Sequence, residues 1–268
     1  MSVVPLFGVG TFRLKGEIAR QSVSDALSIG YRAVDTAQIY DNEAEVGEAI
    51  AQSGVKREEI FLTTKVWITN FSKERFIPSL EESLNKLRSD FVDLALIHWP
   101  SPSGVPLRVY IEELIKAKQK GLTRHIGVSN FPNALLKEAI EIAGKGEIAC
   151  NQVELSPWFQ NRAVRRFAIA NDVEIVSYMT LSYGKYLNDP VISKIAAARG
   201  IDNAGAVIAW AISKAIAVIP SSTSRAHLLS NLKASELRLG AEEIGAIDAL
   251  ERGARECDPE GLAPEWDN

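Results

Sequence analysis

Short apolar runs rich in β-branched residues alternate along this chain with longer segments of helical spacing. The runs span residues 6–10, 33–37, 60–65, 92–99, 125–130, 150–155, 174–179 and 216–222. Amphipathic stretches between them, such as residues 78–87 and 110–121, carry apolar residues at helical intervals. About eight strand–helix units in 268 residues predict an α/β fold of the (β/α)8 barrel type, which typically needs ~250 residues.

A doubly wound open sheet is the competing fold. The even spacing of the runs and the absence of a linker or a composition break favour the barrel, as a single domain over residues 1–268. The final segment, residues 252–268, contains Pro259, Gly261 and Pro264 and has no helical period. We expect this C-terminal tail to lie near the active site, where it could act as a lid.

Charge and cysteine content argue against several classes of protein. A net charge of −4 and a pI of about 5.6 argue against a basic nucleic-acid-binding face and against strong attraction to an anionic membrane. With only Cys150 and Cys257, a disulfide framework is not expected. The first residues do not read as a signal peptide, and no apolar run is long enough to cross a bilayer. We therefore expect a cytoplasmic protein without nucleic-acid or membrane partners.

Polar side chains gather at the predicted ends of the strands, where the active site of a (β/α)8 barrel lies. They are Thr11, Asp35, Lys65, His98, Ser129, Asn130, Gln152, Glu154, Tyr178, Ser221 and Ser222. Burying a charged group in a dry barrel interior is costly unless it has a partner. The pattern therefore indicates that these side chains converge on one functional rim.

Asp35, Tyr40, Lys65 and His98 form a set that suits the reduction of a carbonyl group. A tyrosine normally titrates near ~10, and a nearby lysine ammonium lowers that pKa, which makes the phenol a better proton donor. Asp35 would keep Lys65 charged and in place. His98 would hydrogen-bond the substrate oxygen and orient it. A hydride could then reach carbon while a proton reaches oxygen.

Each member of this set also has an ordinary structural interpretation. Asp35 could cap the following helix, and Lys65 could be a solvated charge at a strand end. Tyr40 could be a packing residue and His98 a core histidine with satisfied hydrogen bonds. Four suitable residue types in order along successive strands favour the functional interpretation.

Other conspicuous residues receive no catalytic role. His125 and His227 are assigned none, and Cys150 is interpreted as a small buried hydrophobic residue. The segment FGVGTF, residues 7–12, is not a dinucleotide fingerprint, because no third glycine follows and no helix opens directly after it. We expect Gly10 and Thr11 to line the site of a barrel instead.

Six motifs together resemble the aldo-keto reductase family over essentially the whole chain. They lie at residues 31–47 (YRAVDTAQIYDNEAEVG), 63–67 (TTKVW), 94–100 (LALIHWP), 126–131 (IGVSNF), 151–157 (NQVELSP) and 218–232 (VIPSSTSRAHLLSNL). The C-terminal segment PEGLAPEWD, residues 259–267, adds a closer resemblance to the short bacterial members that are 2,5-diketo-D-gluconate reductases of type B.

The resemblance implies a role for each residue of the set. Tyr40 matches the proton donor, and Lys65 and Asp35 match the pair that tunes its pKa. His98 matches the residue that orients the carbonyl group. The family uses no metal, and this sequence shows no cluster with metal-ligand spacing.

The resemblance also implies a nicotinamide cofactor site. Its residues are Gly10, Thr11, Asp35, Ser129, Asn130, Gln152, Tyr178, Leu181, Ser221, Ser222, Thr223, Arg225 and Asn231. Ser129, Asn130 and Gln152 match positions that hydrogen-bond the nicotinamide carboxamide. Tyr178 matches the aromatic ring on which the nicotinamide stacks.

The 2′-phosphate end of the cofactor site departs from the family pattern. Many members have a lysine where this chain has Ser221 and an arginine where it has His227. Arg225 lies two positions away and could supply the missing cation. We therefore expect NADPH to be preferred over NADH, by a smaller margin than the full pattern would give.

Aromatic side chains are implied in binding the substrate. Phe12, Trp67, Trp99 and Trp158 match positions near the carbonyl group, beside His98, and Trp266 could reach it from the tail; ordinary packing is the alternative for each. The sequence thus predicts a monomeric NADPH-dependent reductase of aldehydes and ketones. Its substrate would be a small carbonyl compound such as 2,5-diketo-D-gluconate or a methylglyoxal-like 2-oxoaldehyde.

Two rival functions are open at this point. A nucleotide-binding sensor or regulatory subunit with little turnover need not keep all four groups of the set, so the complete set argues against it. A lyase could act through Lys65 as a Schiff base. Asp35 and Tyr40 favour a charged lysine, which is a poor nucleophile.

Overall fold

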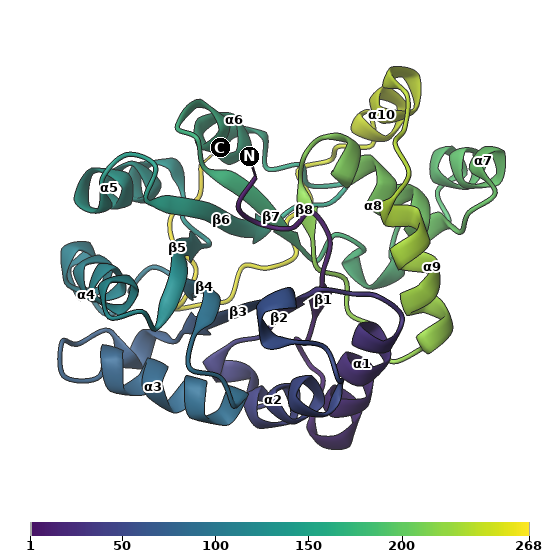
Figure 1. The fold of residues 1–268 in the computed structure, drawn as a ribbon. Helices are drawn as coiled ribbons and strands as arrows, with labels where there is room; N and C mark the ends of the chain where they lie inside the picture. Colours follow the sequence, from purple (N-terminus) through teal and green to yellow (C-terminus); the bar gives the residue numbers. More distant parts are fainter. Residues whose placement is uncertain (1, 268) are drawn as a thin grey trace.

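The computed structural model describes residues 2–267 and places eight parallel strands inside a ring of helices (Figure 1). The strands are β1 (Val9–Gly10), β2 (Ala33–Asp35), β3 (Phe61–Val66), β4 (Val92–Ile97), β5 (Thr123–Ser129), β6 (Ile148–Glu154), β7 (Glu174–Tyr178) and β8 (Ala217–Val218). Each strand coincides with one of the eight predicted runs. The first and last strands are shorter than predicted, since β1 and β8 each contain only two residues.

The sheet closes on itself. Consecutive strands pair in the order β1 to β8. Phe7 also forms a parallel bridge with Val218, and the Gly8 N–H donates to the Val218 carbonyl oxygen at 3.0 Å. Gly10 allows a close approach at this seam, since a Cβ there would lie 2.5 Å from the Ile219 carbonyl oxygen. The (β/α)8 prediction is confirmed, because an open doubly wound sheet has neither this consecutive order nor this closure.

Helices cover the outside of the barrel. The longer ones are α1 (Gly16–Ser28), α2 (Glu43–Gln52), α3 (Phe76–Leu87), α4 (Leu107–Gln119), α5 (Asn133–Ala143), α6 (Arg162–Ala170), α7 (Pro190–Arg199), α8 (Asn203–Ser213), α9 (Arg225–Ser235) and α10 (Ala241–Asp248). Single 3-10 turns are η1 (Gln38–Tyr40), η2 (Arg57–Glu59), η3 (Ile68–Asn70) and η4 (Ser182–Gly184). The predicted helices at residues 78–87 and 110–121 correspond to α3 and α4.

The main hydrophobic core lies between the strands and the helices, and a smaller cluster fills the barrel interior. All six residues of β4 are buried, as expected for a strand covered on both faces. The interior cluster contains Leu94, Leu96, Val176 and Cys150, which is fully buried. The interpretation of Cys150 as a small buried hydrophobic residue is confirmed.

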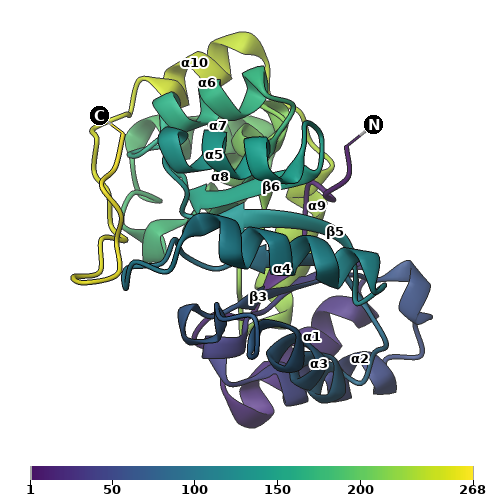
Figure 2. The same cartoon turned by 90° about the vertical axis from the view of Figure 1, so that its left-hand side faces the viewer.

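The two ends of the chain lie on opposite sides of the molecule (Figure 2). The N-terminal segment approaches the end of the barrel where the strands begin. The C-terminal tail after α10 runs without helix or strand past the end where the strands finish. The tail is therefore on the side where the active site of a barrel is expected.

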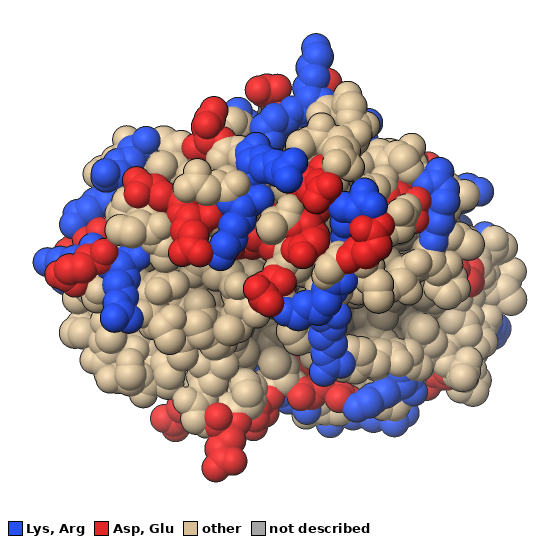
Figure 3. Space-filling view, turned by 90° about the horizontal axis from the view of Figure 1, so that it is seen from below, with Lys and Arg blue, Asp and Glu red and all other residues tan. Residues whose placement is uncertain are grey.

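The surface carries mixed charge. Lys and Arg are interspersed with Asp and Glu on the face shown in Figure 3, with no extended block of one sign there. Within residues 2–267 no single helix is long and apolar enough to cross a bilayer. The pair α7 and α8 passes by length and composition, but the two helices are bent by 87°.

Candidate active site

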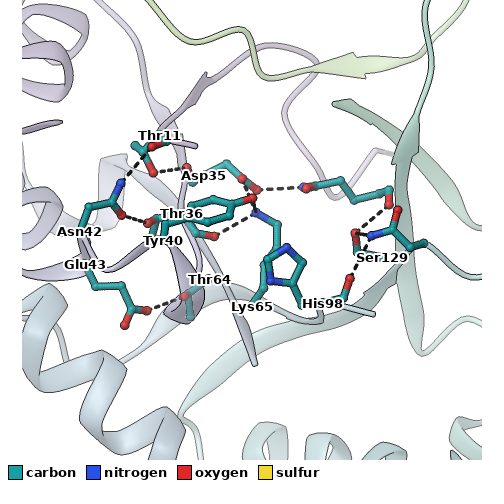
Figure 4. A network of polar contacts seen from close by, with 12 residues as sticks. Thr11, Asp35, Thr36, Tyr40, Asn42, Glu43, Thr64, Lys65, His98 and Ser129 are labelled. Carbon is teal, nitrogen blue, oxygen red and sulfur yellow. Dashed lines mark hydrogen bonds and ion pairs between the residues drawn. The ribbon is translucent and has the colours of Figure 1, made fainter. Parts of the chain in front are cut away.

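Asp35, Tyr40, Lys65 and His98 meet at the end of the barrel where the strands finish (Figure 4). Asp35 is the last residue of β2, Tyr40 ends η1, and Lys65 lies near the end of β3. His98 follows β4 directly. The structure thus brings together the four side chains that the sequence singled out.

Lys65 is the centre of this cluster and is fully buried. Its ammonium forms an ion pair with Asp35 Oδ1, donates to the Thr36 carbonyl oxygen at 3.0 Å, and donates to the Tyr40 hydroxyl oxygen at 3.3 Å. Burial lowers the pKa of Lys65, but the charges of Asp35 and Tyr40 more than offset this, so its pKa lies above the ordinary value. Asp35 therefore does not cap a helix, and a charged Lys65 does not suit Schiff-base chemistry.

The pKa of Tyr40 corrects one expectation. Burial raises the pKa of Tyr40, and the charge and hydrogen bond of Lys65 only partly oppose this rise. The net shift is therefore upward, whereas the sequence argument considered the lysine alone and expected a lowered value. The phenol consequently holds its proton at neutral pH in this state, as a proton donor must.

His98 is buried and neutral. Burial and the neighbouring charge of Lys65 hold the pKa of His98 well below its ordinary value of 6.5. Its ring meets the rings of Tyr40 and Trp67 edge-on, with centroids 5.6 Å and 5.2 Å apart. Among the described residues none hydrogen-bonds its Nδ1 atom, which is buried. The neutral ring can donate a hydrogen bond to a substrate oxygen.

Two residues that the sequence argument did not single out hold the turn that carries Tyr40. The Asn42 side-chain amide donates to the carbonyl oxygens of Thr11 and Leu14 at 2.9 Å each and accepts from the Thr36 hydroxyl at 2.7 Å. The Gln38 amide oxygen accepts from the Trp67 backbone N–H at 2.8 Å. These contacts fix the turn against both neighbouring loops.

A cavity of about 580 Å³ opens beside the four residues. The expected site residues that line it are Gly10, Phe12, Asp35, Tyr40, Trp67, His98, Trp99, Ser129, Asn130, Gln152, Tyr178, Leu181 and Ser221. Residues that the sequence argument missed are Ile39, Met179, Thr180, Ser182, Tyr183, Gly184, Leu187, Ile219, Pro220 and Cys257. Most of these lie in the loop after β7, where the sequence argument singled out only Leu181.

Amide and hydroxyl groups cluster on one wall of the cavity. The Tyr178 hydroxyl donates to Asn130 Oδ1 at 2.6 Å, and the Asn130 amide donates to the His98 carbonyl oxygen at 3.0 Å. The Gln152 amide donates to Asp35 Oδ2 at 2.9 Å, and the Ser129 hydroxyl donates to the Gln152 carbonyl oxygen at 2.8 Å. This mixture of amide donors and acceptors beside a half-buried aromatic ring fits a nicotinamide with its carboxamide.

The expected phosphate end lies at the start of α9. Ser224 caps this helix, where its hydroxyl accepts from the His227 N–H at 3.4 Å, and Thr223 is exposed beside it. Ser222 is held from the other side, since its carbonyl oxygen accepts from the Ser22 hydroxyl at 2.8 Å. A helix N-terminus flanked by hydroxyl groups fits a phosphate.

Arg225 does not point freely into solvent. Its Nη1 atom donates to the Ser28 hydroxyl at 2.6 Å and to Asp25 Oδ1 at 3.2 Å, both on the last turn of α1. A bound 2′-phosphate would have to compete with Asp25 for this guanidinium. Asn231 is buried in α9 and does not line the cavity.

The aromatic residues and Thr11 divide into two groups. Phe12, Trp67 and Trp99 line the cavity, whereas Trp158 and Trp266 do not. Trp158 packs on Tyr186, with ring centroids 5.4 Å apart, and Trp266 packs on the edge of Trp99 at 6.1 Å. Thr11 is fully buried behind the cavity wall, where its N–H and hydroxyl both donate to the Asp35 carbonyl oxygen at 3.0 Å. None of these three residues lines the cavity itself.

Within residues 2–267 no group of three or more His, Cys, Asp or Glu side chains is arranged to hold a metal ion.

Sequence comparison identifies related proteins. The model of the aldo/keto reductase family matches residues 7–252. The chain is 56% identical over 265 residues to the methylglyoxal reductase DkgB of Escherichia coli O157:H7, which covers 98% of this chain and 99% of that protein. It is 35% identical to the aldo/keto reductase slr0942 of Synechocystis sp., over 94% of this chain and 87% of that protein.

Structure comparison agrees. A solved structure of a protein provisionally described as a 2,5-diketo-D-gluconic acid reductase B superposes with a TM-score of 0.95 at 40% identity, over 99% of this chain and 94% of the other. The aldose reductase from Schistosoma japonicum superposes with a TM-score of 0.90 at 28% identity, over 97% and 92% of the two chains.

Proposed function

The chain belongs to the aldo/keto reductase family, and we propose that it reduces small aldehydes and ketones with NADPH, using Tyr40 as the proton donor. One observation carries the assignment of the proton donor. The Tyr40 hydroxyl lies on the cavity wall and accepts a hydrogen bond from Lys65, which is itself paired with Asp35. A phenol in contact with a buried cation is an acid whose anion is stabilised as the proton leaves.

Each of the four residues has a separate role in the reaction. A bound nicotinamide cofactor supplies the hydride that adds to the carbonyl carbon. Tyr40 gives its proton to the carbonyl oxygen, and the Lys65 ammonium stabilises the phenolate that remains. Asp35 keeps Lys65 charged and fixed in position. Neutral His98 donates a hydrogen bond to the same oxygen and thereby orients the carbonyl group toward Tyr40.

NADPH is the proposed cofactor. The Ser129, Asn130 and Gln152 side chains would hold the carboxamide, and the Tyr178 ring would stack on the nicotinamide. The phosphate end would be held by the start of α9, where Arg225 is the nearest cation to the implied 2′-phosphate position. Because Arg225 is shared with Asp25, the proposed preference over NADH is moderate.

Methylglyoxal-like 2-oxoaldehydes and 2,5-diketo-D-gluconate are the proposed substrates. Of the proteins compared above, one is named a methylglyoxal reductase and another is provisionally described as a 2,5-diketo-D-gluconic acid reductase B. The cavity joins indole walls from Trp67 and Trp99 to the polar cluster at Tyr40 and His98. Such a site can accept the apolar side of a small molecule while polar groups hold its carbonyl oxygen.

We propose further that the enzyme acts as a monomer in the cytoplasm. The four catalytic side chains and the cavity come from one chain, so the site is complete without a partner. The tail, residues 252–268, belongs to the same domain in this proposal, and Cys257 from the tail lines the cavity.

Turnover by the purified protein tests the function. Methylglyoxal and 2,5-diketo-D-gluconate are each supplied with NADPH and then with NADH, and the loss of nicotinamide absorbance is followed. We expect turnover of at least one substrate, faster with NADPH at equal concentration. Tight nucleotide binding without turnover of either compound, or of a wider panel of aldehydes, would favour a nucleotide sensor instead.

A further inference from the structure

Glu154, the last residue of β6, is a fully buried carboxylate that has no part in the chemistry described above. Its two oxygens accept hydrogen bonds from two consecutive backbone N–H groups of the C-terminal tail. The Glu256 N–H donates to Oε1 and the Cys257 N–H donates to Oε2, both at 2.7 Å. The carboxylate thus reaches from the barrel interior to a segment that is about a hundred positions away in sequence.

The arrangement suits an ionised carboxylate. Both oxygens accept hydrogen bonds from N–H groups. If the acid were protonated, its O–H would point at one of these N–H donors and that hydrogen bond would be lost. Burial raises the pKa of Glu154 above its ordinary value, and the two backbone N–H groups and the charge of Arg255 oppose this rise only in part. Paired N–H groups compensate a buried charge that would otherwise be costly.

Other contacts also hold this part of the tail to the barrel. The Arg252 and Ala254 N–H groups donate to the Trp158 carbonyl oxygen at 3.0 Å and 3.2 Å, just before the residues that Glu154 binds. Glu256 forms an ion pair with Lys185, in the loop after β7. The Arg255 guanidinium lies over the rings of Phe159 and Trp266, at 4.3 Å and 3.7 Å. Between α10 and residue 267 the tail has no helix or strand, so its path depends on individual contacts of these kinds.

The position of these two tail residues matters for the cavity. Cys257 lines the cavity, and Trp266, further along the tail, packs on Trp99, which also lines it. Release of residues 256 and 257 would therefore move Cys257, which lines the cavity. It would also loosen the packing of Trp266 against Trp99, which lines the cavity as well.

We propose that Glu154 is a positioning residue that latches the C-terminal tail onto the barrel and so shapes the substrate side of the cavity. The effect on the substrate rests on the proposed function, whereas the effect on the tail does not. The predicted defect is in binding the carbonyl compound, because Glu154 does not touch the four reacting side chains.

Glu174 provides a matched control. It is the first residue of the neighbouring strand β7, and its carboxylate accepts from the Val3 and Val4 N–H groups at 2.6 Å and 3.0 Å. It therefore holds the N-terminal segment by the same chemistry at the opposite end of the barrel, where no residue of the cavity lies. Glu154→Gln and Glu174→Gln remove the same charge and keep the same shape.

The test compares the two variants in the full-length chain by two measurements. Native-state trypsin cleavage after Arg255, identified by peptide mass, reports release of the tail. Steady-state kinetics with methylglyoxal and saturating NADPH report KM and kcat. For Glu154→Gln we expect faster cleavage and a higher KM, each by about tenfold, the scale of one lost hydrogen bond to a charged group, with kcat nearly unchanged. Glu174→Gln should change neither.

Each other result has a defined meaning. Unchanged cleavage after Arg255 in Glu154→Gln would overturn the latch. Faster cleavage with an unchanged KM would overturn its role in shaping the cavity. If Glu154→Gln does not fold, Glu154→Asp keeps the charge but shortens the side chain, and unchanged cleavage after Arg255 in that variant would overturn the latch. Absence of turnover in the wild-type protein would contradict the proposed function, while cleavage would still decide the latch.

Discussion

The Lys65 ammonium lies 3.3 Å from the Tyr40 hydroxyl oxygen and donates a hydrogen bond to it, while Asp35 pairs with the same ammonium from the other side. The three groups therefore form a line from a buried carboxylate, through a buried cation, to a phenol on the cavity wall. Lys65 is not itself on that wall. The cation is placed to stabilise the phenolate without contacting the substrate.

Replacing Tyr40 by Phe removes the proposed proton donor and nothing else from the cavity wall. We expect kcat with methylglyoxal and NADPH to fall by about 10²- to 10⁴-fold, the usual contribution of a general acid. The NADPH dissociation constant, measured by protein fluorescence, should stay nearly unchanged. Tyr183→Phe is the matched control, since Tyr183 lines the same cavity but is 58% exposed and does not contact Lys65. A Tyr40→Phe enzyme that turns over as fast as the control would exclude Tyr40 as the donor.

Lys65→Met tests the buried ion pair by leaving Asp35 without its cation. The cost of an uncompensated buried charge is about 3–5 kcal/mol, so the urea midpoint of unfolding should fall strongly. Asp35→Asn combined with Lys65→Met leaves neither charge and should regain much of that stability, whereas turnover should stay low in both variants. If the single variant is as stable as the wild type, the pair does not hold the site as described.

In the folded protein His98 should remain neutral even when the pH is below 6.5, its ordinary pKa. Burial and the charge of Lys65 disfavour the charged form and so lower its pKa. The unfolded chain takes up a proton at this residue as the pH falls through that value, while the folded protein does not. The free energy of unfolding should therefore fall as the pH drops below 6.5, and His98→Asn should remove this part of the slope. NMR titration of the histidine ring protons, assigned with His98→Asn, measures the pKa directly. A midpoint at or above 6.5 for His98 would contradict the prediction.

The alternation of apolar runs and helical segments was enough to predict the fold. The barrel fold then indicated that residues at the C-terminal ends of the strands would form the active site. Asp35, Lys65 and His98 could be predicted because they lie at or near the ends of strands. Tyr40 was selected with them because a phenol beside a lysine can donate a proton, and the resemblance then supplied the role of each residue. The direction of the Tyr40 pKa could not be predicted, because it depends on how deeply the ring is buried. Sequence shows a charged neighbour but not the amount of water excluded around it.

Contacts between distant loops were also beyond prediction. Glu154 was recognised as a strand-end carboxylate, but its partners are backbone N–H groups, which carry no residue-specific signal. Trp158 matched a substrate position and Trp266 was expected to reach the site from the tail, yet each packs on another ring. The orientation of a side chain in a loop depends on neighbours that the spacing of a motif does not specify.

Asp25 should weaken the preference for NADPH, and its charge can be removed separately. Asp25 Oδ1 accepts from the Arg225 guanidinium at 3.2 Å, and this surface pair is only partly shielded from water. Asp25→Asn frees Arg225 and also removes a negative charge near the proposed 2′-phosphate. An exposed ion pair contributes about 0–1 kcal/mol, so we expect the ratio of kcat/KM for NADPH over NADH to rise by up to about fivefold.

Two further variants isolate this effect. Glu17→Gln is the matched control, because Glu17 lies on the same helix and pairs with Arg20 instead, at 2.5 Å. It changes the net charge equally and should leave the ratio unchanged. Arg225→Leu should lower the ratio, and adding Asp25→Asn to it should then have little effect, since both substitutions act on one interaction. A ratio that rises equally in Asp25→Asn with and without Arg225 would mean that Asp25 acts by simple charge repulsion, and the proposed competition for the guanidinium would be wrong.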